Sequence, residues 1–129
     1  MDHVLKNFSF IKLLLHAHSK QRKAILESAS LKQINILNEI LLNIIQGIIP
    51  STPEDQAFLQ RYQRVINLLL NKRIGLKIKK RTLFLKPKLL NKFLTIAIPV
   101  LDNVQNPTQV HTNTTRKVSS STTGKERVE

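Results

Sequence analysis

The 129-residue sequence contains no cysteine, no tryptophan and only three glycines. Without cysteine the chain can form no disulfide, no thiolate zinc site and no cysteine nucleophile. Its aromatic residues are five phenylalanines and one tyrosine, which are too few to predict a stacking platform for single-stranded bases. Gly47, Gly75 and Gly124 stand alone, so the sequence has no glycine-rich phosphate loop.

Groups for acid–base or metal chemistry are also sparse. The eight acidic residues are scattered, and their only adjacent pair, Glu54 and Asp55, suits the first turn of a helix. His16 and His18 would point about 200° apart on a helix, and no third ligand is near them in sequence. We therefore expect no catalytic residue, no metal site and no cofactor, and we do not expect an enzyme.

Long hydrophobic runs are missing as well. The uncharged segment 93–101 has less than half of the ~20 residues that a membrane span requires. Near the amino end, Lys12 interrupts the apolar residues, and little positive charge precedes them, which is unlike a secretory signal. We expect neither a transmembrane span nor secretion.

Positive charge is what the sequence has in excess. Lysine and arginine number 21, and the formal net charge is +13. The C-terminal cassette, residues 74–101, places seven cations before an apolar end, with no acid between Gly75 and Leu101. Such a run favours a polyanion as partner, because each cation that meets a phosphate releases a condensed counterion.

Apolar residues recur at every third and fourth position through most of the chain, which is the period of an α-helix. The predicted fold class is therefore all-α, a small bundle of about five helices with the basic and apolar cassette at its end. Helical segments, one of them short, are expected over residues 3–17, 20–26, 31–46, 53–72, 76–85 and 88–98. Residues 1–102 are expected to form one basic helical domain. The polar tail, residues 103–129, is expected to be disordered because it has too little apolar surface to bury.

Start and stop signals are clearest in the middle of the chain. Ser30 and Gln33 have the spacing of a capping box, so a helix should begin directly after Ser30. Gly47 suits the left-handed position after that helix, and Thr52 followed by Pro53 marks the next start. We expect the apolar faces of these two helices to pack together through Ile34, Leu37, Leu41, Ile44, Phe58, Leu59, Tyr62, Ile66 and Leu69.

Two sets of contact residues are predicted. The first set is expected to bind nucleic acid through its phosphates, and it comprises Lys20, Arg22, Lys23, Arg61, Arg64, Lys72, Arg73, Lys77, Lys79, Lys80, Arg81, Lys86, Lys88 and Lys92. The second set is expected to contact a membrane or a protein, and it comprises Phe93, Leu94, Ile96, Ile98 and Leu101. A solvated face is the alternative interpretation of the charge cluster at residues 20–23.

Three short segments carry a resemblance to a known family. They are Gln21-Arg22-Lys23-Ala24, Gly47-Ile48-Ile49-Pro50 and Leu76-Lys77-Ile78-Lys79-Lys80. Their order resembles that in the small basic helical proteins of Maverick/Polinton elements and adintoviruses, whose ends look like adenovirus core or membrane-active minor proteins. The chain departs from that family at residues 90–94, where glycines are often found. The resemblance implies a virion-associated protein, located in a virion or a host nucleus.

Three functions are consistent with these observations. The first is a non-enzymatic structural protein, such as a virion core component, that binds nucleic acid, above all DNA, without reading its sequence. The second is a membrane-active minor virion protein that lays residues 86–101 along an anionic bilayer. The third is a helical adaptor whose apolar end binds a capsid or host protein. The run of cations favours the first.

Overall fold

The computed structural model describes residues 2–105, with side chains from Val4 onward. All regular elements in this range are helices, so the all-α prediction is confirmed. The eight helices between residues 2 and 105 are α1 (Asp2–Lys6), α2 (Phe8–His16), α3 (Ser19–Ser28), α4 (Leu31–Ile45), α5 (Pro53–Gln60), α6 (Gln63–Leu70), α7 (Leu76–Leu85) and α8 (Pro87–Gln105). Residues 103–105, which were expected to belong to the disordered tail, instead form the end of α8, and the rest of that tail lies outside the described residues.

The structure has more helices than the five or so that were expected, partly because two of the expected helices are each divided in two. The first divides at Asn7, between α1 and α2, and the second divides at Arg61 and Tyr62, between α5 and α6. Asn7 and Tyr62 have ψ values of 22° and 21°, away from the helical range. The spacing of apolar residues continues across both breaks, which is why periodicity alone did not predict them.

The predicted start and stop signals around α4 are confirmed. The Ser30 hydroxyl accepts a hydrogen bond from the Gln33 backbone N–H at 3.1 Å, and the Gln33 side chain accepts from the Ser30 backbone N–H at 2.9 Å. Gly47 has a φ of 79° directly after the helix, where most residues would be strained. At the start of α5, the Thr52 hydroxyl accepts from the Asp55 backbone N–H at 3.1 Å.

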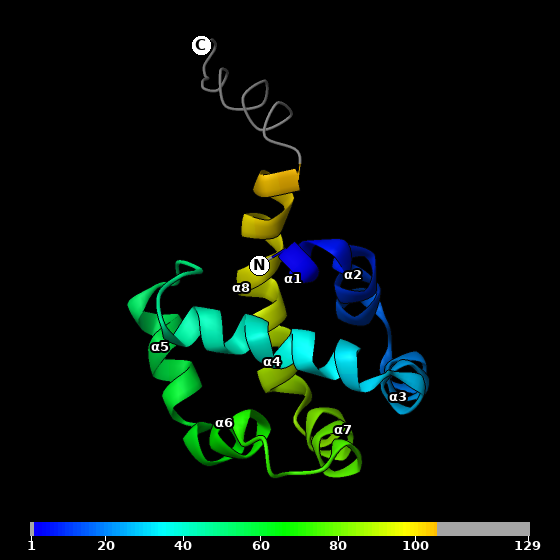
Figure 1. Cartoon of the computed structure of the whole chain (residues 1–129). Coiled ribbons are helices and arrows are strands. Elements are labelled where there is room, and N and C mark those ends of the chain that lie inside the picture. The colour runs from blue at the N-terminus through cyan, green and yellow to red at the C-terminus, as the bar shows by residue number, and fades with distance from the viewer. Residues whose placement is uncertain (1, 106–129) are drawn as a thin grey trace, which may run out of the picture.

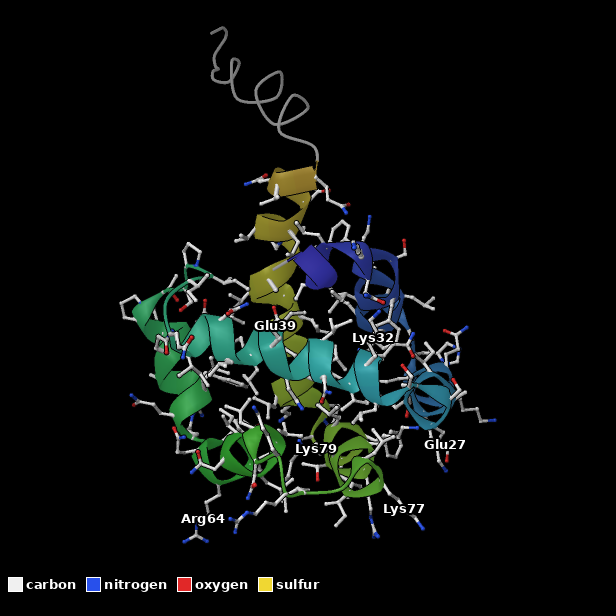
Figure 2. All side chains as sticks on the ribbon, in the orientation of Figure 1. Glu27, Lys32, Glu39, Arg64, Lys77 and Lys79 are labelled. Atoms are coloured by element: carbon white, nitrogen blue, oxygen red, sulfur yellow. The ribbon has the colours of Figure 1, made fainter. Side chains whose placement is uncertain are left out.

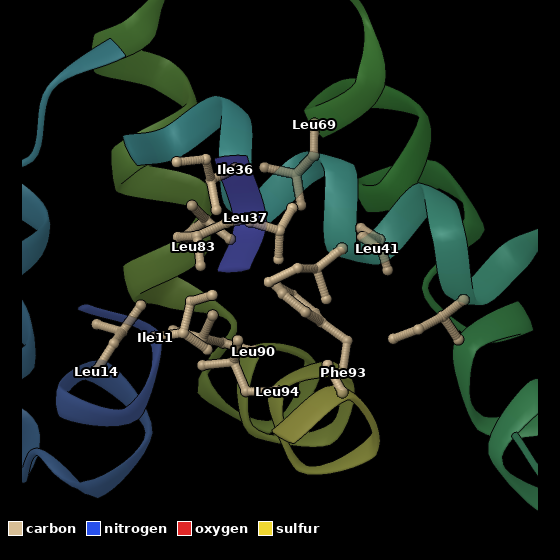
Figure 3. Packing of buried hydrophobic residues seen from close by; sticks show 14 of the residues in the cluster. Ile11, Leu14, Ile36, Leu37, Leu41, Leu69, Leu83, Leu90, Phe93 and Leu94 are labelled. Atoms are coloured by element: carbon tan, nitrogen blue, oxygen red, sulfur yellow. The ribbon is translucent and has the colours of Figure 1, made fainter. Parts of the chain in front are cut away.

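Helix α8 lies at the centre of the fold and packs against α2, α4 and α7 (Figure 1). One of its faces is buried, and this face contains Leu89, Leu90, Phe93, Leu94, Ala97 and Leu101. In Figure 3, Phe93 and Leu90 face Leu37 and Leu41 of α4 across the core. Burial of so many large apolar side chains is the main favourable term in the folding of a small domain.

The predicted contact between α4 and the two helices after it is confirmed. All nine residues named for it belong to one hydrophobic cluster, in which Phe58 and Tyr62 are partly buried and the others are buried. The rings of Phe58 and Tyr62 lie 5.3 Å apart, measured between centroids. Tyr62 therefore anchors the break between α5 and α6 against the core.

The end of α8 differs from the sequence prediction. The last helix was expected to end at residue 98, just before Pro99, yet it continues through the proline to Gln105. Ala97 and Leu101 lie on either side of the proline in sequence, and both are fully buried. Their packing outweighs the cost of about 3 kcal/mol that a proline brings to a helix interior. The side-chain amide of Gln105 then donates to the Leu5 carbonyl at 3.0 Å.

Candidate functional site

Helices α3 and α7 pack side by side and enclose a hollow of about 600 Å³, the α3/α7 cleft. Its apolar floor is made by Leu26, which is buried, and by Leu76 and Phe84, which are half-buried. The rim carries positive charge and one acid, and its residues are Lys23, Glu27, Lys77, Lys80 and Arg81. A concave site with an apolar floor and a charged rim has the general form of a binding site.

Two contacts hold the cations of this cleft in place. The Lys80 ammonium donates to the backbone carbonyl of Glu27 at 2.8 Å, in the last turn of α3. A cation is favourable at this end of a helix because the unpaired carbonyls there carry partial negative charge. Across the cleft, the Lys23 ammonium lies 5.9 Å from the ring centroid of Phe84. Cations from segments about fifty residues apart in sequence therefore share one cleft.

Positive charge continues from the cleft toward α6. Arg64 on α6 and Lys72 and Arg73 in the connection to α7 are exposed. Figure 2 shows Arg64 and Lys77 at the same end of the molecule, both pointing away from α4. The sequence has no acid from residue 56 to residue 101. These cations form the basic surface, which comprises Lys23, Arg64, Lys72, Arg73, Lys77, Lys80 and Arg81.

Other cations from the predicted set are exposed but lie outside the cleft. Lys20 is at the start of α3, and Lys86 and Lys88 flank the start of α8. Arg61 lies at the end of α5, where its guanidinium is 5.0 Å from the Phe58 ring centroid. We do not count these four residues in the basic surface.

Lys92 has a partner of its own. Its ammonium lies 3.0 Å from the Asp55 carboxylate, and both side chains are partly exposed. This hydrogen bond from Lys92 is the main cause that lowers the pKa of Asp55, and hydrogen bonds from Thr52 add to it. The ammonium also lies 5.2 Å from the Phe58 ring centroid. Lys92 therefore helps to join α8 to α5.

Two predicted phosphate-binding residues are corrected because they are buried. Arg22 is 6% exposed, and its Nη2 donates to the carbonyls of Leu14 and Leu15 and to the Asn91 side chain, at 3.1, 3.2 and 2.7 Å. Burial lowers the pKa of its guanidinium. Lys79 is also 6% exposed, on the inward side of α7. Neither residue lies on an open surface.

The predicted membrane or protein contact set is corrected as well. Phe93, Leu94 and Leu101 are fully buried, and Ile96 and Ile98 are half-buried against the same cluster. The apolar side of the cassette therefore packs inside the fold, because it is the side on which α8 meets α2 and α4. Within residues 2–105, no helix combines the length and the apolar character that crossing a membrane requires.

The structure also brings together residues that the sequence analysis did not select. Asn38 is buried in the middle of α4, and its side-chain Oδ1 has no hydrogen-bond partner within the described chain. Ile78 and Leu85 are more than half exposed on the outer side of α7. In the sequence, Asn38 stands out as a polar residue in the middle of an apolar helix. The imperfect helical period of residues 76–85 was the sequence feature that indicated apolar side chains outside the core, here Ile78 and Leu85.

His16 and His18 are both exposed. In the described part of the chain, no group of three or more histidine, cysteine or acidic residues could hold a metal ion.

Comparison with known proteins does not assign a family. No protein-family model, no curated protein and no solved structure matches the chain. The resemblance to Maverick/Polinton and adintovirus proteins therefore stays a prediction.

Proposed function

We propose that the protein is a non-enzymatic structural protein that binds nucleic acid, above all duplex DNA, through its phosphates and without reading sequence. A virion core is the setting that the resemblance suggests. The proposal concerns the folded domain, residues 2–105. It assigns phosphate contact to the basic surface and not to the buried Arg22 and Lys79.

The observation that carries this proposal is the packing of α3 against α7. This contact adds Lys23 to Lys77, Lys80 and Arg81 around one cleft. The three cations of α7 belong to a segment of 46 residues, 56–101, that has no acid. Glu27 of α3 is the one acid on the cleft rim and cannot neutralise four cations, so the cleft keeps its attraction for an outside anion. Phosphate contact then gains entropy through counterion release.

The composition of α7 supports binding without sequence readout. Base recognition in the major groove commonly uses asparagine, glutamine or arginine held in a bidentate geometry. Helix α7 has no asparagine and no glutamine, and most of its cations are lysines. Lysine acts as a compact point charge toward phosphate and has little geometric selectivity. We therefore expect similar affinity for duplexes of different sequence.

The test compares two triple variants with the same change in net charge. The surface variant changes Lys23, Lys77 and Arg81 to glutamine and leaves Lys80 in place, because Lys80 bonds to the Glu27 carbonyl. If all three cations contact phosphate, the slope of log affinity against log salt for duplex DNA should fall by about 2 to 3 units. The measurement is fluorescence anisotropy at several salt concentrations.

The matched control changes Lys6, Lys12 and Lys32, which are exposed on α1, α2 and α4, to glutamine. We expect this control to change the slope by less than about one unit, because charges that do not contact phosphate act only through a screened field. Equal losses in the two variants would mean that net charge and not the basic surface determines the binding, and the proposal would then be wrong.

A second candidate function is peripheral binding to an anionic membrane, and the exposed Ile78 and Leu85 of α7 favour it. They lie on the same helix as Lys77 and Arg81, so α7 could bring apolar and positive groups to a bilayer surface together. Changing Ile78 and Leu85 to serine separates the candidates. If this variant loses both vesicle binding and biological activity while DNA binding is unchanged, membrane binding is the favoured function.

A further inference from the structure

The α3/α7 cleft has an apolar floor that phosphate contact leaves unused. Leu76 and Phe84 are only half-buried there, and Leu26 completes the floor. Duplex DNA that is bound without sequence readout meets a protein through its phosphates and sugars, which bring no apolar side chain into such a hollow. An occupant with apolar side chains would remove this floor from water, which is favourable in proportion to the area covered. The floor therefore favours a protein segment as an additional partner.

One side of each helix forms the cleft. Helix α3 contributes three residues at helical spacing, and α7 contributes five, which run along one side of the helix from Leu76 to Phe84. This stretch of α7 spans about two turns, or about 12 Å. A helix laid into a groove uses apolar residues at positions i, i+3, i+4 and i+7, which also span about two turns. The cleft therefore has the length that one short amphipathic helix requires.

The rim of the cleft determines the charge of the occupant. Lys23 stands on the α3 side, and Lys77 and Arg81 stand on the α7 side, all three exposed. In Figure 2, Glu27 and Lys77 lie at the same corner of the molecule, on α3 and on α7. Glu27 is the one acid among the residues that line the cleft. An acidic segment is therefore attracted from both walls, whereas a basic segment is repelled.

Charge argues against two occupants that this protein could itself supply. Residues 106–129 contain four lysines and arginines but only two acids, and their aliphatic residues are three valines. A second copy of the chain would bring a net charge of +13 to a positive rim. A bilayer would meet Ile78 and Leu85, which do not line the cleft. The occupant is therefore sought in another protein.

We propose that the α3/α7 cleft binds an acidic amphipathic helix of a partner protein. The apolar side of that helix covers Leu76 and Phe84. Its carboxylates, on both flanks of the apolar side, meet Lys23 on one wall and Lys77 and Arg81 on the other. The inference does not rest on nucleic-acid binding, because the floor that it uses takes no part in phosphate contact.

The experiment uses the full chain and a fluorescently labelled peptide of about 14 residues, with leucine along one side of the helix and glutamate along the other. Fluorescence anisotropy measures its affinity without DNA. One control peptide has the same composition in scrambled order, and the other has glutamine in place of glutamate. We expect the parent peptide to bind at least about tenfold more tightly than either control, because both the apolar side and the charge are needed.

Each control peptide has an outcome that would overturn the proposal. Equal affinity for the scrambled peptide would mean that charge alone attracts the ligand, as it does for phosphate. Equal affinity for the glutamine peptide would mean that the rim cations play no part. Backbone amide shifts in NMR spectra should concentrate in α3 and α7, and shifts centred on other helices would place the peptide elsewhere.

The variant Phe84→Ala removes part of the floor and leaves every rim cation in place. It should weaken the parent peptide at least about tenfold, because aromatic residues commonly dominate the binding energy of an interface. Leu85→Ala, on the exposed side of the same helix, is the matched control and should stay within about twofold of the wild type. The salt dependence of duplex binding should be the same in both variants, because neither changes a cation. Unchanged peptide affinity in Phe84→Ala would overturn the proposal.

A charge-reversed variant keeps the test decisive if Phe84→Ala does not fold. Lys77→Glu with Arg81→Glu changes two exposed residues of the rim and should abolish binding of the parent peptide. Lys6→Glu with Lys12→Glu makes the same change in net charge at exposed positions outside the cleft, and it should weaken the peptide by less than about threefold. Equal losses in the two double variants would show that net charge and not the cleft holds the peptide.

Discussion

Arg22 shows how a residue can belong to a basic motif and have a structural role. It lies in a run of cations at the start of α3, which predicted an anion site, but its guanidinium turns inward. There it satisfies the carbonyls of Leu14 and Leu15 at the end of α2 and joins them to Asn91 of α8. The last carbonyls of a helix have no intrahelical partner, so an arginine fork meets a need that the fold creates.

Replacing Arg22 by alanine should lower the free energy of unfolding by about 2–4 kcal/mol, because the buried Leu14 carbonyl, the part-buried Leu15 carbonyl and the Asn91 amide oxygen lose their donor. Lys20→Ala, an exposed change in the same turn, should stay within about 0.5 kcal/mol of the wild type. Urea denaturation followed by circular dichroism measures both. If Arg22→Ala and Lys20→Ala lower the free energy of unfolding equally, Arg22 does not have the structural role described above.

The ion pair of Asp55 and Lys92 predicts a dependence of stability on pH. The pKa of Asp55 is lowered in the fold, mainly by Lys92, so the folded state favours the ionised carboxylate. This contribution is present above the ordinary carboxyl pKa of about 4 and is lost as pH falls through the lowered folded value. Asp55→Asn should therefore be less stable than the wild type at neutral pH, and the difference should shrink in strong acid.

Thermal melts of the wild type and of Asp55→Asn at neutral pH and in strong acid check this expectation. Glu54→Gln, an exposed change in the same first turn, is the control for the loss of one negative charge near the start of α5. A difference between wild type and Asp55→Asn that stays constant over the whole acid range would mean that the pair adds no stability through ionisation.

Helix boundaries that depend on neighbouring residues could be predicted from the sequence, and boundaries that depend on tertiary packing could not. The capping box at Ser30 and the turn at Gly47 depend on a few neighbouring residues, and both were predicted from sequence. The breaks at Asn7 and at Tyr62 lack such signals, because apolar spacing continues through them. The helices on both sides of each break contribute apolar residues to one hydrophobic cluster, which is a tertiary feature.

Pro99 provides a test of how packing overrides a local signal. Pro99→Ala restores a backbone N–H that can donate to the carbonyl four residues earlier, and it creates no cavity because Pro99 is exposed. We expect it to raise the free energy of unfolding by about 1–3 kcal/mol. Denaturant unfolding provides the measurement.

Pro87→Ala is the matched control, because Pro87 is the first residue of α8, where proline is tolerated. It should change stability by less than about 1 kcal/mol and should not stabilise. If Pro99→Ala destabilised the protein instead, the backbone geometry at this proline would be required for the packing of Ala97 and Leu101.

For the whole molecule, the composition indicated a positive surface but not which cations form it. Lys77 and Lys79 are two residues apart on α7, yet one is exposed and the other is buried. The choice depends on which side of α7 meets α4 and α6, and this is a long-range contact. The α3/α7 cleft likewise requires two segments that are distant in sequence, so spacing along the chain could not predict it.

The central position of Phe93 predicts that the fold as a whole depends on it. Phe93→Ala should cost about 3–5 kcal/mol, because this fully buried ring would leave a cavity between α4 and α8. Small domains have a total stability of only about 5–15 kcal/mol, so the variant should be close to unfolding at room temperature. Val104→Ala, an exposed change on the same helix, should be nearly neutral.

Circular dichroism melts of the two variants measure this difference. A folded and stable Phe93→Ala protein would contradict the placement of α8 in the core. The same reasoning shows that substitutions at Phe93 or Leu94 cannot test membrane binding, because loss of the fold would precede any effect on a bilayer.

The place of α8 in the chain also has a consequence for biosynthesis. The ribosome makes α2 and α4 early, but the buried face of α8 that covers them is made last among the described helices. Until residues 89–101 leave the exit tunnel, the apolar faces of these earlier helices have no partner. The domain should therefore complete its fold only after these residues have emerged, and until then the nascent chain should depend on chaperones to avoid aggregation.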